Sequence, residues 1–165
     1  MKGFQFKIDG DWAHFKKPET NNNPLSHDLI PKTALIGMIG AVLGIEREKM
    51  KSLFPQLSED LLYGVELLKP VKKASCGFTS HTAINPTAIK SPKAFEMLRD
   101  VSYKVCVGLY GERSQSIFDE FQKAILEGYA VYDPYLGIAN CPAELTFISH
   151  GEFTMMGTGD FKTKG

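Results

Sequence analysis

The chain has 165 residues, of which 43% are hydrophobic and 23% charged, so it is long enough for one globular domain and too short for two comfortable ones. Lys and Arg together number 19, and so do Asp and Glu, which makes the net charge zero. This balance excludes the basic excess of an independent nucleic-acid-binding domain, so any such role must rest on local clusters or on a larger assembly.

Cysteine usage and hydropathy indicate the compartment. Cys76, Cys106 and Cys141 are widely spaced, with no CxxC or Cys/His pattern for zinc or a disulfide framework, so we expect reduced thiols, no metal and no cofactor. The longest apolar run, residues 34–45, is well short of the ~20 residues that cross a bilayer, and the N-terminus has no secretory apolar core. We therefore expect a cytoplasmic protein with no membrane partner.

The N-terminal segment predicts a strand followed by a long loop. Apolar and polar side chains alternate over residues 4–8, the pattern of a strand with one buried face. The phase changes after Gly10, because Ala13 and Phe15 form the next apolar pair, which predicts a β-bulge there. Residues 18–31 are rich in Pro, Asn and Ser and are expected to form a loop.

A buried helix is expected next. Residues 33–44 are apolar almost all round, with Thr33 as the candidate N-cap and Gly44 as the candidate C-cap. Gly37 and Gly40 lower the helix propensity by roughly 1 kcal/mol each relative to Ala. That cost predicts a neighbouring element packed very close to the helix.

Prolines end or interrupt the predicted elements in the middle of the chain. A short second helix is expected near residues 46–53, ended by Pro55. Residues 63–74 predict a second strand, in which Pro70 indicates an edge position. Residues 75–93 predict a long hairpin arm or a loop.

The C-terminal half predicts a strand, a helix and a last strand. Apolar residues alternate strictly over residues 101–109, which predicts the third strand. Ser116 with Asp119 resembles a capping box, and the apolar helical face that follows is closed by Gly128. The alternation over residues 143–148 predicts the last strand.

The predicted order is strand, helix, strand, strand, helix, strand. It is the order of the α+β, ferredoxin-like (RRM-like) β-α-β-β-α-β fold, here with a long arm between the second and third strands. We expect one domain over residues 1–150 and a short C-terminal strand or tail over residues 151–165. The fold alone does not decide the function.

Two segments far apart in the sequence carry the candidate binding groups. The first runs from residues 10–18 to the glycine-spaced residues 33–44, and the second is residues 133–144; each combines aromatic, basic or amide side chains with glycines that let another backbone come close. Such segments suit gripping an extended polymer better than enclosing a metabolite. A binding module is therefore the first hypothesis and an enzyme the second.

Lysines supply the candidate phosphate contacts. The pairs Lys16–Lys17 and Lys72–Lys73 can hold phosphates as flexible point charges, and solvated surface is the alternative interpretation of each. Lys32 and Thr33 open the buried helix, where free N–H groups and the helix dipole make an anion site. Helix capping explains Thr33 equally well.

Aromatic side chains adjoin the first lysine pair. Trp12 is expected in the core, and either His14 or Phe15 is expected to stack an exposed base, because neighbouring residues of a strand face opposite ways. The four histidines are scattered, and no nucleophile–base arrangement is indicated. A ribonuclease would need His81 to converge with Tyr63, Lys72 or Lys90 on one 2′-hydroxyl, and a solvated His81 is the alternative.

Three motifs together resemble the Cas5 family of CRISPR-associated proteins, most closely its type I-B variants. They are residues 10–18, the segment from Pro31 through the glycine-spaced helix to Gly44, and the segment from Tyr135 to Ala143. The motifs occur in the family's order and at roughly its spacing. The resemblance covers about residues 3–150, nearly the whole chain.

The resemblance implies a subunit of the Cascade interference complex that caps one end of the assembly and holds the 5′ handle of the CRISPR RNA. It implies as partners the Cas7 backbone subunit, which the arm would reach, and a large Cas8-type subunit. By position, the handle site falls on residues 10–17 with Lys32 and Thr33, the arm on residues 75–93, and a backbone-contacting turn on residues 135–140.

The chain departs from the family pattern in two ways. Type I-C members cut precursor RNA with a tyrosine and an adjacent Lys-His pair, and this chain has no Lys-His dipeptide. We therefore expect no catalytic residue. Members are also commonly longer, with further strand-rich sequence after the core, so the chain is either a truncated or a minimal member.

We predict a noncatalytic, RNA-binding assembly subunit. A metal-independent endoribonuclease that processes precursor CRISPR RNA is the second hypothesis, and an unrelated ferredoxin-like domain for a small ligand or a protein is the third. The residues assigned to RNA binding are His14, Phe15, Lys16, Lys17, Lys32, Thr33, Lys72, Lys73, His81, Tyr135, Gly137 and Asn140.

Overall fold

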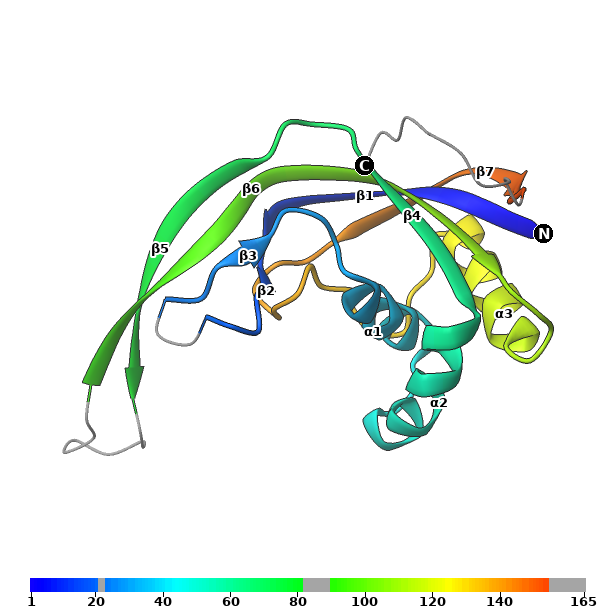
Figure 1. Cartoon of the computed structure of the whole chain (residues 1–165), viewed down its shortest axis with the longest axis horizontal. Coiled ribbons are helices and arrows are strands. Elements are labelled where there is room, and N and C mark those ends of the chain that lie inside the picture. The colour runs from blue at the N-terminus through cyan, green and yellow to red at the C-terminus, as the bar shows by residue number, and fades with distance from the viewer. Residues whose placement is uncertain (21–22, 82–89, 155–165) are drawn as a thin grey trace.

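The computed structural model describes residues 1–20, 23–81 and 90–154, shown in Figure 1. The strands are β1 (Lys2–Ala13), β2 (Phe15–Lys16), β3 (Ser26–His27), β4 (Leu61–Leu67), β5 (Lys72–His81), β6 (Lys90–Leu109) and β7 (Glu144–Glu152). The helices are α1 (Lys32–Leu43), α2 (Arg47–Asp60) and α3 (Gln115–Glu127). The main sheet is antiparallel, in the order β4-β6-β1-β7. Strand β5 also pairs with β6, along residues 90–99, whereas β4 pairs with residues 103–109. The coarser part of the expected α+β fold, an antiparallel sheet combined with helices, is confirmed.

The helices cover one face of the sheet (Figure 1). On that face β1 contributes Phe4, Phe6 and Ile8, each at most 1% exposed, which confirms the predicted alternation. The ring centroid of Phe4 lies 5.4 Å from that of Phe118 and 5.8 Å from that of Phe121, both in α3. Aromatic contacts of this kind fasten α3 to the centre of the sheet.

Helix α1 is buried, as its composition predicts, but it begins differently. Its N-cap is Pro31, no side chain caps the helix, and Thr33 is an exposed residue of the first turn. The prediction of Thr33 as N-cap is therefore wrong, because proline already supplies the extended conformation that precedes the helix. Gly44 is the predicted C-cap, with a φ of 67°.

Only one of the two glycines inside α1 has a close neighbour. A Cβ on Gly40 would lie 3.0 Å from the sulfur of Met50 in α2. Gly37 is exposed, and a Cβ there would meet no atom within 4 Å. The predicted close packing is confirmed at Gly40 and wrong at Gly37.

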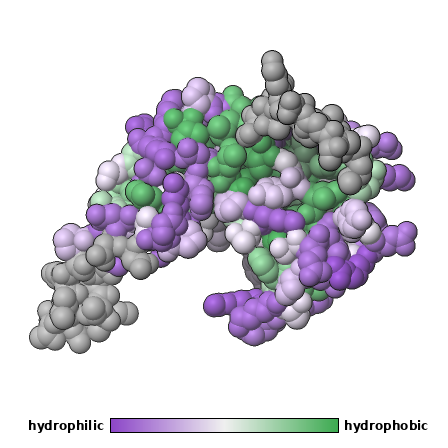
Figure 2. All heavy atoms as spheres, viewed as in Figure 1, coloured by the Kyte–Doolittle hydropathy of each residue, from purple (hydrophilic) through white to green (hydrophobic). Residues whose placement is uncertain are grey.

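Helix α2 continues through Pro55, where its end is predicted. Proline removes one helical hydrogen bond and crowds the preceding turn. Beyond it, Leu57 is buried and the Asp60 carboxylate accepts hydrogen bonds from Arg113 and Ser114. These contacts stabilise the last turn against the effect of the proline. Figure 2 shows hydrophilic residues over the lower end of the molecule, where α2 lies.

The phase change in β1 is present, but it is not the predicted bulge. Strands β1 and β6 keep one register throughout, whereas a bulge would shift it by one residue. Ala13 and its partner Leu98 are both buried, although the earlier buried hydrophobic residues of β1 are at even positions. The buried side chains of both strands therefore switch from one alternate set of positions to the other at the same point. Asp100 allows this with a φ of 51°, a conformation that Asp tolerates. A register shift does occur between Gln5 and Phe6, against β7.

The predicted second strand is divided in two. Strands β4 and β5 are separated around Pro70, and each pairs with β6 alone, which agrees with the predicted edge position. Strands β5 and β6 then curve away from the helices as a hairpin, the expected arm (Figure 1). Residues 82–89 of the arm lie outside the described residues.

The C-terminal elements begin and end differently from the prediction. Helix α3 has Ser114 as N-cap, and the Ser116 hydroxyl donates to Glu120 at 3.2 Å, so the capping box is wrong. Gly128 is the predicted C-cap, with a φ of 65°. Strand β7 is longer than predicted, and most of the predicted tail, residues 155–165, lies outside the described residues. None of the helices in the described part of the chain is long and apolar enough to cross a membrane.

Candidate nucleic-acid interface

The two glycine-bearing segments, residues 10–18 and 133–144, lie against each other. The backbone N–H of His14 donates to the carbonyl of Leu136 at 3.0 Å. A Cβ on Gly10 would lie 2.4 Å from Leu136 Cδ1, and a Cβ on Gly137 would lie 1.9 Å from the carbonyl oxygen of His14. Protein therefore fills the space beside these glycines, which corrects the expectation that they leave room for an extended polymer.

His14 and Phe15 are both buried, at 2% and 3% exposed. The His14 Nδ1–H donates to the Glu96 carbonyl at 2.8 Å, and the Phe15 ring packs 6.3 Å from that of Tyr103. Neither ring is available to stack a base. The alternation argument failed because His14 lies between β1 and β2, where the strand geometry is interrupted.

Lys72 and Lys73 are engaged with carboxylates of the protein. Lys73 Nζ lies 2.9 Å from Asp28 and 3.3 Å from Glu96, and the hydrogen bond to Asp28 raises the pKa of Lys73. Lys72 Nζ lies 3.2 Å from Asp100. These pairs join the base of the arm to the loop after β3 and to β6, so neither lysine is free for phosphate.

Lys16 and Lys17 remain without an ion pair in the described part of the chain, and Lys16 is exposed. Lys32 was expected to hold phosphate, but its ammonium donates to the Ser58 carbonyl of α2 at 2.5 Å. The start of α1 thus holds a cation and a neighbouring helix instead of an open anion site. His81 lies in β5, and its side chain is outside the described residues.

The turn after α3 presents polar and aromatic groups. Tyr135 is 42% exposed, and Asn140 is exposed, while the Leu136 N–H donates to the Cys141 carbonyl at 2.7 Å and closes the turn. Tyr129 and Tyr132 were not predicted to be surface residues. Both are exposed, and their position just after the helix-ending Gly128 is typical of a surface loop.

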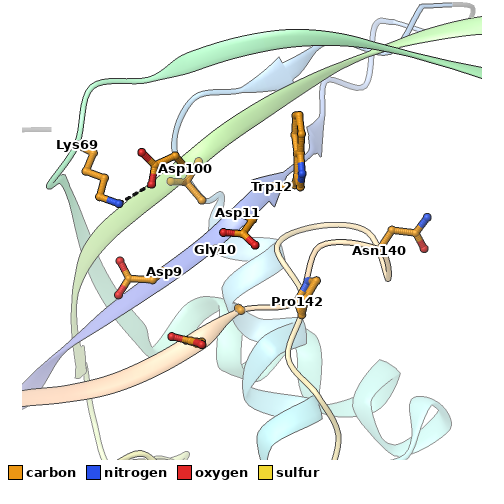
Figure 3. Close-up of a pocket in the computed structure, with 11 residues that line it drawn as sticks. Asp9, Gly10, Asp11, Trp12, Lys69, Asp100, Asn140 and Pro142 are labelled. Atoms are coloured by element: carbon orange, nitrogen blue, oxygen red, sulfur yellow. Dashed lines mark hydrogen bonds and ion pairs between the residues drawn. The ribbon is translucent and has the colours of Figure 1, made fainter.

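A cleft of about 460 Å³ opens where β1, β6 and this turn meet (Figure 3). Four carboxylates line it, and we call it the acidic cleft; its lining residues are Asp9, Gly10, Asp11, Trp12, Lys69, Asp100, Val101, Asn140, Pro142, Ala143 and Glu144. The lining comes from segments far apart in the chain, so no local pattern could have predicted it. Trp12, expected in the core, is only partly buried and forms one wall.

Two of the four carboxylates of the acidic cleft have partners. Burial opposes the charge on Asp9, but hydrogen bonds from Lys7 and Ser102 outweigh burial and lower the pKa of its carboxyl. The Asp100 carboxylate lies 2.5 Å from Lys69 and 3.2 Å from Lys72, and the hydrogen bond from Lys69 is the main cause of its lowered pKa.

The groups that a ribonuclease would need do not all converge. Tyr63 pairs with position 107 of β6 and Lys72 with position 99, eight residues apart and therefore about 26 Å along the strand. His81 pairs with Lys90, nine residues further along β6. In the described ranges, no group of three or more His, Cys, Asp or Glu side chains is placed to hold a metal ion.

The sheet face away from the helices has no aromatic platform at its centre. Central positions of β1 and β6 on that face carry Gln5, Lys7, Asp9, Ser102, Lys104 and Cys106. An RRM stacks bases on aromatic side chains at such positions. RNA recognition of that kind is therefore not available on this part of the sheet.

A sequence model of the family described as "CRISPR-associated protein (Cas_Cas5)" matches residues 3–158. No curated protein matches the chain. Among solved structures, a chain of a "CRISPR RNA-guided surveillance complex" is similar at 16% identity and a TM-score of 0.63, covering 84% of this chain. A crystal structure of a "CRISPR-associated Protein" is similar at 15% identity and a TM-score of 0.54, covering 90% of this chain and 69% of its own.

A protein from Streptococcus mutans, SMU1763c, described as functionally uncharacterized, is similar at 19% identity and a TM-score of 0.51, covering 90% of this chain and 69% of its own. At such identities the likeness shows a shared fold. The chain spans 58% of the length of its counterpart in the surveillance complex.

Proposed function

This chain belongs to the Cas5 family of CRISPR-associated proteins, and from that membership we propose that it is a noncatalytic subunit of a Cascade interference complex. In this proposal it binds the 5′ handle of the CRISPR RNA and caps the backbone assembly. The match of the family model over residues 3–158 is the observation that carries the proposal.

The fold supports a finer assignment, ferredoxin-like. The order β4-β6-β1-β7, with every pair antiparallel and the helices on one face, is the order expected for a β-α-β-β-α-β chain. The hairpin of β5 and β6 leaves this core as an arm, and we assign it to contact with the Cas7 backbone subunit. A large Cas8-type subunit is the further partner we propose.

The proposed handle contact centres on Lys16 and Lys17. They follow the junction between β1 and the turn that carries Asn140, and they have no ion pair in the described residues. Lysine at such a position holds phosphate without reading sequence. Because the chain as a whole is neutral, we infer that most of the RNA charge is neutralised by other subunits.

The test uses CRISPR RNA with an intact or a scrambled 5′ handle, mixed with the full chain without metal, and follows binding and cleavage together. Tighter binding of the intact handle, with no cut, is expected. Replacing Lys16 and Lys17 by Ala should reduce the slope of log affinity against log salt by about 1.4, since each phosphate contact on single-stranded RNA contributes about 0.7.

The matched control replaces Arg47 and Lys49 of α2, two exposed cations without an ion pair in the described part of the chain. This double variant removes the same charge and should keep the salt slope. Equal slopes for both double variants would remove Lys16 and Lys17 from the site. If no RNA binds, even with the Cas7 backbone subunit present, the RNA hypothesis is wrong and a domain for a small ligand or a protein remains.

Endoribonuclease activity is the second candidate, because the register places His81 opposite Lys90 in the arm. Cleavage at the handle boundary, lost in His81→Ala and retained in His27→Ala, would support it. A chain that binds the handle and leaves it intact supports the noncatalytic assignment.

A further inference from the structure

We propose that the acidic cleft receives one unpaired RNA base with an exocyclic amino group, held between the indole of Trp12 and the carboxylates of Asp11 and Glu144. This inference rests on the proposed RNA binding. It goes beyond it by naming the part of the RNA that enters the cleft and the chemical group that is read there.

The indole ring of Trp12 supplies the surface on which a base would stack. The guanidinium carbon of Arg99 lies 5.4 Å from the centroid of the Trp12 ring. Trp12 lines the acidic cleft and is labelled in Figure 3, whereas Arg99 is not among the lining residues. The cation–π contact fixes the ring, and a base that stacks on it meets a surface that is already ordered.

Two carboxylates of the cleft are free to accept hydrogen bonds. Asp9 and Asp100 are paired with lysines, but Asp11 and Glu144 are exposed and form no ion pair or side-chain hydrogen bond in the described residues. Glu144 lies opposite Asp9 in the pairing of β7 with β1, two residues from Asp11. An ionised carboxylate only accepts hydrogen bonds, so these two groups select a ligand that donates.

This donor requirement selects among the bases. Guanine, adenine and cytosine each present an exocyclic amino group, and uracil presents none. Guanine fits a carboxylate best, because its N1–H and its amino group lie side by side on the edge that an unpaired base exposes. The amide of Asn140, at the rim of the cleft, can donate and accept.

Charge and size decide which part of the nucleotide enters. The free carboxylates repel phosphate, so the RNA backbone stays outside, toward the unpaired Lys16 and Lys17, and a neutral base goes in. The volume of about 460 Å³ lies within the usual range for small-molecule sites and holds one base with space for water.

Trp12 is the only tryptophan of the chain, so its fluorescence reports on the cleft directly. The probes are short oligouridine RNAs that carry one central guanosine, inosine or uridine, with a 3′ label for anisotropy. We expect the guanosine probe to quench Trp12 and to bind about 30-fold more tightly than the all-uridine probe, the middle of the range for one bidentate base contact. Inosine, which lacks the amino group, should lose part of that preference.

Asp11→Asn and Glu144→Gln should each remove most of the preference for guanosine without weakening the binding of oligouridine. Asp133→Asn is the matched control, because Asp133 is an exposed carboxylate that does not line the cleft. Both substitutions in the cleft are at exposed positions, so the fold is retained.

RNA that binds by anisotropy but leaves Trp12 fluorescence unchanged, or quenches it equally with every base, overturns this inference and leaves the proposed function intact. If Glu144→Gln keeps the base preference and instead prevents assembly with the Cas7 backbone, the cleft takes a basic protein side chain and the inference is wrong. Absence of binding by these probes and by CRISPR RNA contradicts the proposed function itself.

Discussion

Asp60 is the most strongly engaged buried carboxylate in the described part of the chain. Its side chain is 6% exposed and accepts hydrogen bonds from the Arg113 guanidinium and, at 2.6 Å, from the Ser114 hydroxyl. The bond from Arg113 is the main cause of the lowered pKa of Asp60, and burial opposes it. One side chain thus joins the end of α2 to the start of α3.

Asp60→Asn should lower the free energy of unfolding in urea by about 1.5–3 kcal/mol, the range for a hydrogen bond to a charged group. Because the pKa of Asp60 is lower folded than unfolded, its stabilisation is complete above the unfolded value of about 3.9 and is lost as the pH falls through the folded value. The variant should therefore lose less stability than the wild type on acidification below about pH 4.

The control is Glu59→Gln, which removes an exposed partner of the same Arg113, 2.9 Å away. An exposed pair contributes at most about 1 kcal/mol, so this variant should stay near the wild type. Equal losses in the two variants would contradict the role assigned to the buried carboxylate.

Gly137 is a second residue whose identity the structure requires. Its φ is 93°, and a Cβ would lie 1.9 Å from the backbone oxygen of His14. Gly137→Ala should destabilise by more than the ~1–2 kcal/mol of a left-handed alanine, because the junction of β1 with the turn must also separate. Gly111→Ala isolates the first effect, since Gly111 has a φ of 98° and open space. Equal urea midpoints for the two variants would show that the close contact contributes nothing.

At the scale of elements, α1 carries two glycines with different surroundings. Gly37→Ala should stabilise the protein by about 1 kcal/mol, because alanine improves helix propensity and the site is open. Gly40→Ala should gain less, since Met50 must move away from a Cβ 3.0 Å from its sulfur. Thermal unfolding compares the two variants, and an equal rise in Tm would mean that the contact between α1 and α2 imposes no constraint.

The arm is anchored to the body through Glu96. Its carboxylate accepts from the Ser26 N–H at 3.1 Å and from Lys73 at 3.3 Å, and its own N–H donates to the Pro24 carbonyl at 2.9 Å. These bonds tie the loop between β2 and β3 to the base of the arm. The direction of the arm therefore depends on side-chain contacts as well as on strand pairing.

Glu96→Ala should speed hydrogen exchange at the Ser26 amide while β1 keeps its protection, because only the side-chain acceptor is lost. Asp28→Ala is the matched control: it removes the other carboxylate beside Lys73 and leaves the Ser26 bond in place. Faster exchange in Asp28→Ala, or unchanged exchange in Glu96→Ala, would contradict this anchoring.

For the whole molecule, charge balance sets the strength of any RNA contact made alone. Near the junction, the cations without an ion pair in the described residues are Lys16, Lys17 and Arg99. Three phosphate contacts predict a salt slope of about −2 for the isolated chain. Titrations at several salt concentrations measure it, and a slope much steeper than this would mean that cations away from the junction also contact the RNA.

Sequence alone determined much of this protein. Periodicity predicted β1, part of β6, β7 and the helical segments in order, with β4 and β5 as a single strand, because a 2-residue or 3.6-residue repeat of apolar side chains needs only local information. The helix-ending roles of Gly44 and Gly128 followed from the conformation that glycine permits. The family was also identified from three short motifs, and the family match confirms it.

The tertiary structure decided which of the candidate groups are available. His14 and Phe15 are in the core, and Lys73 is held by Asp28 and Glu96, because the partners come from segments distant in the chain. The acidic cleft likewise exists only where β1, β6 and the turn before β7 meet. Burial and charge pairing depend on contacts between distant segments, so a chain read residue by residue could name the groups but not their surroundings.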